Sequence, residues 1–205
     1  FENGADIRYF QPSTIPLIDS TDLIQSTIID SLLSLEINQV TKSDGTPLHY
    51  FIELKEGVCF ENECRPLDIL LYWNITGRYL GFELLDGEYL SKYDHEPFDQ
   101  KEYEKLHQLL ADPFLPLGNY TFEDLVKRPD TVSQSMDGVS GATMKDVLEY
   151  IVPGAAYTTH KLYNIIHGPI QQQVSELTAQ QLNATLFHKI LQSNDQSDQT
   201  WVLER

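Results

Sequence analysis

The sequence predicts an α+β protein, with a twisted antiparallel sheet, helices packed on one side of it, and a helical C-terminal segment. Three observations predict this class. Short segments rich in aromatic and aliphatic residues follow one another in the first half, separated by polar turns. Longer segments with apolar residues at helical spacing dominate the second half. The chain lacks the regular alternation of strands and helices that is typical of a parallel sheet.

The first part of the chain is expected to contain one helix. Residues 1–18 contain Pro12 and Pro16 and are predicted to be extended or irregular. Residues 20–38 are predicted to be helical, with Ser20 or Thr21 as the cap. The apolar residues that recur at helical spacing in this segment are Leu23, Ile24, Ile28, Leu32 and Leu35.

The central part is predicted to form a three-stranded antiparallel meander from residues 48–54, 65–73 and 78–85. A polar loop is expected over residues 86–98. A helix is expected over residues 99–112, because Asp99 and Glu102 form a capping box. Its apolar face is predicted to consist of Tyr103, Leu106, Leu109 and Leu110. A short helix is expected near Thr121.

The last part is predicted to be helical. Pro153 and Gly168 have the positions that proline and glycine prefer at the two ends of a helix. Further helices are expected over residues 178–192 and from residue 199 onward. We therefore predict an α+β domain over residues 1–168 and a helical segment over 169–205. Two alternatives stay open for this segment, namely the first unit of a helical repeat or a helical pair that closes the core.

The charge and the cysteines limit the partners and the compartment. The net charge of −17 makes nucleic acid a poor partner and disfavours an anionic membrane surface. No apolar run approaches the length of about 20 residues that a membrane-spanning helix needs. Cys59 and Cys64 flank four residues that suit a hairpin tip. A disulfide between them would fit an oxidising compartment, and two reduced thiols are the alternative.

The most unusual segment is Asp-Gly-Val-Ser-Gly-Ala-Thr, residues 137–143. Its small residues bury little apolar surface, so it is typical of backbone that approaches a ligand closely. A small-residue turn that leads into a helix N-terminus favours a phosphate. The segment is neither a P-loop nor a G-x-G-x-x-G motif. A plain tight turn stays open, and so does a serine-hydrolase elbow at Ser140 with His160 or His167 downstream.

This segment resembles the flavinylation motif of FMN-binding domains, such as those in subunits of the Rnf complex and of the sodium-pumping NADH:quinone reductase. All seven positions fit. The resemblance implies that a flavin transferase moves FMN from FAD to the Thr143 hydroxyl and forms a phosphoester. Gly138, Gly141 and Ala142 would leave the threonine accessible, Ser140 would bind phosphate oxygens, and Asp137 would fix the loop.

The resemblance implies an extracytoplasmic electron carrier with covalent FMN rather than a turnover enzyme. Its partners would be the flavin transferase and an unidentified redox protein, with a membrane-associated complex, formed through regions outside this chain, as a further option. The alternative is a non-catalytic cell-surface binding or scaffold module with a degenerate FMN-binding-like domain.

Several residues outside this motif are further candidates for a site. His160 and His167 share a helix face, which permits metal binding, although histidines with a structural role are more common there. Asp94, His95 and Glu96 could lie beside a flavin, hold a cation, or form a solvated loop. The aromatic residues that could stack on a flavin ring or pack in the core are Trp73, Tyr150, Tyr157 and Tyr163.

Overall fold

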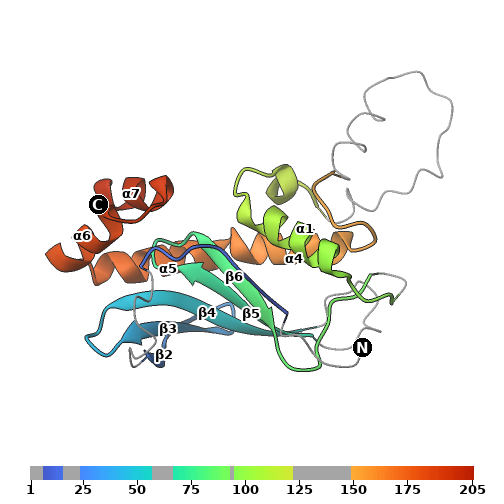
Figure 1. Ribbon diagram of the computed structural model, residues 1–205, viewed down its shortest axis with the longest axis horizontal. Helices are drawn as coiled ribbons and strands as arrows, with labels where there is room; N and C mark the ends of the chain where they lie inside the picture. The colour runs from blue at the N-terminus through green and yellow to red at the C-terminus, as the bar shows by residue number, and fades with distance from the viewer. Residues whose placement is uncertain (1–6, 16–23, 57–66, 93–94, 122–148) are drawn as a thin grey trace, which may run out of the picture. The chain divides into compact units, whose positions relative to one another are not determined.

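A computed structural model describes residues 7–15, 24–56, 67–92, 95–121 and 149–205 (Figure 1). The chain forms two compact units. Unit 1 comprises residues 1–55, 68–88 and 168–205, and unit 2 comprises residues 56–67 and 89–167. The predicted boundary after residue 168 falls next to the point where the chain returns to unit 1. The division into a domain over residues 1–168 and a helical segment over 169–205 stays a prediction.

Unit 1 contains a six-stranded antiparallel sheet in the order β1-β6-β5-β4-β3-β2. The strands are β1 (Arg8–Phe10), β2 (Ile24–Leu32), β3 (Leu35–Lys42), β4 (Pro47–Glu56), β5 (Leu67–Asn74) and β6 (Tyr79–Leu84). The predicted meander corresponds to β4, β5 and β6. The predicted α+β class is therefore confirmed, and the sheet is larger than the sequence indicated.

The helix predicted over residues 20–38 is wrong, because the described part of this segment forms β2 and the start of β3. A β-bulge between Ile28 and Asp30 interrupts the two-residue alternation of the strand, so its apolar residues take on helix-like spacing. Leu33 and Ser34 form the turn between the strands, with φ angles of 54° and 64°. Two positive φ angles are typical of a type I′ hairpin turn, for which Leu-Ser is an unusual sequence.

Three C-terminal helices complete unit 1: α5 (Pro169–Gln180), α6 (Ala184–Leu191) and α7 (Gln196–Leu203). The single helix predicted over residues 178–192 is wrong, because α5 ends at Gln180 and a new helix begins after Asn183. The Asn183 side chain caps this helix by accepting a hydrogen bond from the Leu186 amide. The apolar residues of this segment differ in burial, since Leu186 and Ile190 are buried, whereas Leu182 and Leu191 are half-buried.

Helix α5 lies along one face of the sheet (Figure 1). The Tyr50 hydroxyl lies 3.0 Å from Thr178 Oγ1 and accepts a hydrogen bond of 2.7 Å from Gln39 Nε2. The Gln39 amide also donates to Gln181 Oε1 at 3.1 Å. The sheet and α5 also contribute buried apolar residues to unit 1, and these include Ile52, Leu71, Trp73, Phe82, Ile170 and Val174. No side chain in this hydrogen-bond network has a buried polar atom without a partner among the described residues, so the burial of the network carries little cost.

The opposite face of the sheet is also apolar. The Tyr72 ring contacts the rings of Phe10, His49 and Phe51, at centroid distances of 5.0, 5.7 and 5.6 Å. Burial lowers the pKa of His49 from 6.5 to about 4, so this imidazole is neutral near pH 7. Strand β2 extends this face to its edge with Ile24 and Ile28, which are exposed.

Unit 2 contains α1 (Gln100–Ala111), the 3₁₀ helix η1 (Pro116–Asn119) and α4 (Ala156–Ile166). The predicted capping box of α1 is confirmed, since Asp99 accepts from the Glu102 amide and Glu102 accepts from the Asp99 amide. Its four predicted apolar residues are all buried. Helix α4 begins three residues after Pro153, later than predicted, because Val152 to Ala155 form a turn with Gly154 at φ 76°.

Candidate functional site

The residues predicted to attach FMN lie outside the described residues. They are Asp137, Gly138, Ser140, Gly141, Ala142 and Thr143. The cysteines Cys59 and Cys64 and the short helix expected after Thr121 also lie outside. Residues 122–148 contain the predicted flavinylation motif and are called the motif segment. The structure describes the chain before this segment, up to Thr121, and after it, from Glu149.

The chain before the motif segment is held by α4. The His160 Nε2 atom lies 2.8 Å from the backbone oxygen of Tyr120. A carbonyl oxygen only accepts hydrogen bonds, so Nε2 carries the proton in this contact. Tyr120 also ends η1, where its amide donates to the Leu117 oxygen at 3.4 Å. The backbone at Tyr120 is therefore fixed to two elements of unit 2.

The chain after the motif segment is held by the neighbouring residue of α4. The Val152 amide donates to Thr159 Oγ1 at 3.2 Å, and this hydroxyl donates to the Ala155 oxygen at 2.9 Å. Ile151 and Val152 are buried, which anchors this flank in the core. Thr159 and His160 are consecutive, so one turn of α4 holds both flanks of the motif segment. The sequence "YTTH" has no signal for this role, because the Thr159 contact lies seven residues back, before the helix begins, and the His160 contact lies 40 residues back.

The same helix face continues with Tyr163 and His167. The Tyr163 hydroxyl lies 3.2 Å from the Asp112 oxygen and 3.1 Å from the Leu115 oxygen. His167 Nε2 lies 3.0 Å from the Leu110 oxygen, and its buried Nδ1 has no partner among the residues that the structure describes. Burial lowers the pKa of His167. Helix α4 thus fastens α1, the chain after α1 and both flanks of the motif segment.

These contacts give the two histidines of α4 structural roles. Each places Nε2 against a backbone oxygen, which leaves that nitrogen no lone pair for a metal. Among the described residues, no group of three or more His, Cys, Asp or Glu side chains could hold a metal ion. The serine-hydrolase alternative required one of these imidazoles as a base at Ser140. In the structure, Nε2 of both is already engaged.

The other predicted candidates divide between core and surface. Trp73 and Tyr163 are buried, whereas Tyr150 and Tyr157 are half-buried. In the loop formed by residues 94–96, Asp94 lies outside the described residues, and His95 is exposed with a φ angle of 64°. Glu96 forms an ion pair of 3.3 Å with Lys92, which also lies 3.1 Å from Glu102. The described part of this loop therefore matches a solvated loop with ion pairs.

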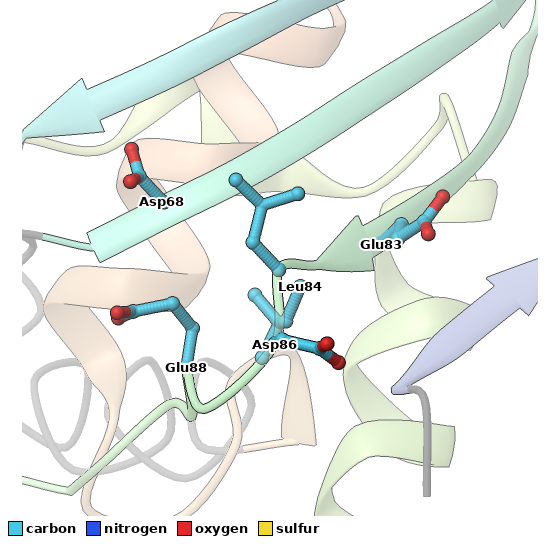
Figure 2. A pocket seen from close by; sticks show the side chains of 6 residues that line it. Asp68, Glu83, Leu84, Asp86 and Glu88 are labelled. Atoms are coloured by element: carbon cyan, nitrogen blue, oxygen red, sulfur yellow. The ribbon is translucent and has the colours of Figure 1, made fainter. Parts of the chain in front are cut away.

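A hollow of about 570 Å³ opens in unit 1 near the ends of β5 and β6 (Figure 2). Its lining residues are Asp68, Glu83, Leu84, Leu85, Asp86 and Glu88. Figure 2 shows Leu84 between the carboxylates of Asp68 and Glu83. Four carboxylates repel a phosphate group, so this hollow does not fit FMN. Glu83 is already bound, since it accepts from Arg8 and from the Tyr72 hydroxyl, both at 3.1 Å.

Comparison of the chain with protein-family models, curated proteins and solved structures gives no match. Within the ranges that the structure describes, no helix has both the length and the apolar character needed to cross a membrane.

Proposed function

We propose that this chain carries FMN as a phosphoester on Thr143 and serves as an extracytoplasmic electron carrier. One observation carries the proposal, namely the agreement of all seven residues from Asp137 to Thr143 with the flavinylation motif. The structure is compatible with it, since Thr159 and His160 of α4 hold the described chain at Val152, after the motif, and at Tyr120, before it.

The attachment chemistry requires only the threonine hydroxyl from this chain. The Thr143 oxygen attacks the FMN phosphorus of FAD, a new P–O bond forms, and the bond to the AMP phosphate breaks. AMP leaves, and the hydroxyl proton passes to a base of the transferase or to water. When bound, FMN supplies transfer of one or two electrons, and the protein sets its surroundings.

The charge of the chain explains why a covalent bond suits this cofactor. A net charge of −17 opposes the binding of a phosphate dianion from solution. A phosphoester keeps the flavin in place regardless of this repulsion. The redox partner has to approach an acidic protein, so a basic docking surface on that partner is expected.

The test is co-expression with a flavin transferase and an export signal, followed by mass measurement of the intact protein. The wild type should gain the mass of one FMN less one water. Thr143→Val should remove the adduct, and Thr143→Ser should keep it because a hydroxyl remains. Thr131→Val, which changes a threonine before the motif, is the matched control and should still be modified.

The proposal fails if the wild type stays unmodified in cells where the transferase modifies a known acceptor protein. It also fails if the Thr143→Val variant keeps the adduct, because the attachment residue would then be another one.

A cell-surface binding module is the second candidate function, and the exposed apolar edge of unit 1 favours it. Purification of the protein from its native compartment separates the two functions. An electron carrier is yellow there, whereas a degenerate domain that only binds a partner is colourless.

A further inference from the structure

Strand β2 forms one edge of the sheet and is unusually open for an edge strand. It has nine residues and pairs with β3 on one side only, within the part of the chain that the structure describes. Its first six side chains are all exposed. The opposite edge differs, since β1 has only three residues and Arg8 is paired with Glu83. Long exposed edges are templates for pairing with another strand, and most proteins protect them.

The protection of β2 is confined to its second half. The bulge between Ile28 and Asp30 and the charge of Asp30 both lie there. Asp30 also accepts a hydrogen bond from Gln173 of α5, so this half is fixed to its own unit. The first half, Ile24–Ile28, has no proline, no glycine, no charge and no bulge. A regular strand of about 17 Å therefore has one edge without a pairing strand among the described residues.

The residues of this half form a palindrome of polarity, Ile-Gln-Ser-Thr-Ile. In an antiparallel pair of two such strands centred on Ser26, Ile24 of each copy lies opposite Ile28 of the other, and Gln25 lies opposite Thr27. Ile24, Ser26 and Ile28 share a face, because they are opposite Lys42, Val40 and Asn38 of β3. Ile24 is 49% exposed and Ile28 is 60% exposed, so pairing would cover four isoleucines.

We infer that two copies of this chain pair antiparallel through Ile24–Ile28 of β2, with the twofold axis at Ser26. A second copy fits better than a partner of opposite charge, because the segment contains no charge to attract one. In a chain with a net charge of −17, an uncharged segment is also where two copies can approach with least repulsion. The pairing joins the two sheets and continues the apolar face that contains Phe10, Phe51 and Tyr72.

The length of the contact sets its strength. A five-residue ladder with four isoleucines buries less than the roughly 1,200 Å² of a standard interface, so the dimer is weak, with a Kd on the order of 100 µM. The repulsion between the acidic copies is screened by salt. Added salt should therefore lower the Kd several-fold, whereas an interface made of ion pairs would weaken.

The test is sedimentation equilibrium of the whole chain from about 5 µM to about 500 µM, a range that spans the expected Kd. The wild type should pass from monomer to dimer. The double variants Ile24→Lys with Ile28→Lys, and Ile24→Glu with Ile28→Glu, should each stay monomeric, because like charges then face each other. An equimolar mixture of the two should dimerise again, since each lysine then lies opposite a glutamate.

The matched control is Leu33→Lys, which adds a lysine at another exposed position of the same hairpin but outside the pairing segment. It should dimerise as the wild type does. All these side chains are exposed, so melting temperatures should stay close to that of the wild type. Amide hydrogen exchange gives a second measurement, in which the β2 amides should exchange more slowly at high protein concentration.

Three results would overturn the inference. If the wild type stays monomeric at every concentration, a second copy does not bind this edge, and an extended segment of another protein becomes the better candidate for it. A dimer with unchanged Kd in the lysine variant places the interface elsewhere. Folded variants that do not dimerise in the mixture exclude the register centred on Ser26.

Discussion

Replacement of Arg78 by methionine tests whether one buried ion pair holds α7 to the hairpin of β5 and β6. Arg78 Nη2 lies 2.9 Å from Asp198 Oδ2, and Arg78 Nε lies 3.2 Å from Asp198 Oδ1. The Asp198 side chain is fully buried, and that of Arg78 is 17% exposed. Asp198 also accepts hydrogen bonds from Thr76 at 2.6 Å and from Ser193 at 2.9 Å.

The expected cost follows from the burial of the remaining carboxylate. Removal of one partner of a buried ion pair typically costs about 3–5 kcal/mol, because the other charge stays unpaired. The hydroxyls of Thr76 and Ser193 continue to bind Asp198 in the variant, so we expect the lower value, about 3 kcal/mol. With a urea m-value of about 2 kcal/mol/M, the midpoint of unfolding should fall by about 1.5 M.

The assay is urea unfolding followed by tryptophan fluorescence. The chain has two tryptophans, Trp73 and Trp201, and both belong to unit 1. The signal therefore reports the unit that contains the ion pair. Arg8→Met is the matched control. Arg8 Nε lies 3.1 Å from Glu83 Oε1, but the Arg8 side chain is 52% exposed, so the loss should be at most about 0.5 kcal/mol.

A double-mutant cycle with Asp198→Asn decides whether the charge is responsible. If the reasoning is right, Arg78→Met costs much less when Asp198 is already asparagine, because no buried charge is then left unpaired. Two results would refute it. One is a midpoint shift no larger than that of Arg8→Met. The other is an equal loss with and without the carboxylate, which would mean that Arg78 acts through its other contacts, the ion pair of 3.3 Å with Asp195 and the hydrogen bonds to Gln11 and to the Pro12 oxygen.

Three further predictions concern pH, backbone strain and the cysteines. Burial alone would raise the pKa of Asp198, but hydrogen bonds from Arg78 and its other donors hold the pKa below 3.8. Its contribution to stability is therefore present at neutral pH and lost as the pH falls below about 4, so the difference between wild type and Asp198→Asn in urea unfolding should narrow there. Gly77→Ala should cost at least about 1 kcal/mol more than Gly45→Ala, because both have positive φ but only a Cβ at Gly77 would meet backbone, at 2.8 Å. If Cys59 and Cys64 form a disulfide, the exported protein should react with an alkylating reagent only after reduction, as mass measurement would show.

The sequence predicted elements with strong local signals. Asp99 and Glu102 of α1 form the expected capping box, and the meander of β4, β5 and β6 lies where aromatic and aliphatic residues cluster. It failed for β2 and β3, because a bulge changed the spacing of the apolar residues and the Leu33-Ser34 turn lacks the usual Asn-Gly signal. The pairing of β1 with β6 was also beyond prediction, since it joins residues far apart in the chain.

The candidate site shows the same division between local and distant signals. The motif from Asp137 to Thr143 is visible in the sequence because its chemistry is local. The support from Thr159 and His160 is not visible, because the Thr159 hydroxyl bonds the Val152 amide before the helix begins and the His160 ring bonds the Tyr120 oxygen, 40 residues earlier. The sequence spacing predicted that His160 and His167 share a helix face. In the structure, both rings form hydrogen bonds with residues that precede α4, His160 with the Tyr120 oxygen and His167 with the Leu110 oxygen. The spacing could not predict the partner of each imidazole, which is a backbone carbonyl oxygen and not a metal ion.

The strong negative charge connects the proposed attachment with the proposed dimer. Each copy carries a charge of −17, so a free phosphate ligand and a second copy of the chain are both repelled at long range. Two kinds of contact remain available, a covalent bond, which is insensitive to this repulsion, and an uncharged surface, which keeps the acidic side chains of the two copies away from the contact so that salt can screen them over a Debye length of about 8 Å at physiological ionic strength. Thr143 would supply the first and Ile24–Ile28 the second. A salt series separates them, because the FMN adduct should be independent of ionic strength, whereas dimerisation should strengthen as salt is added.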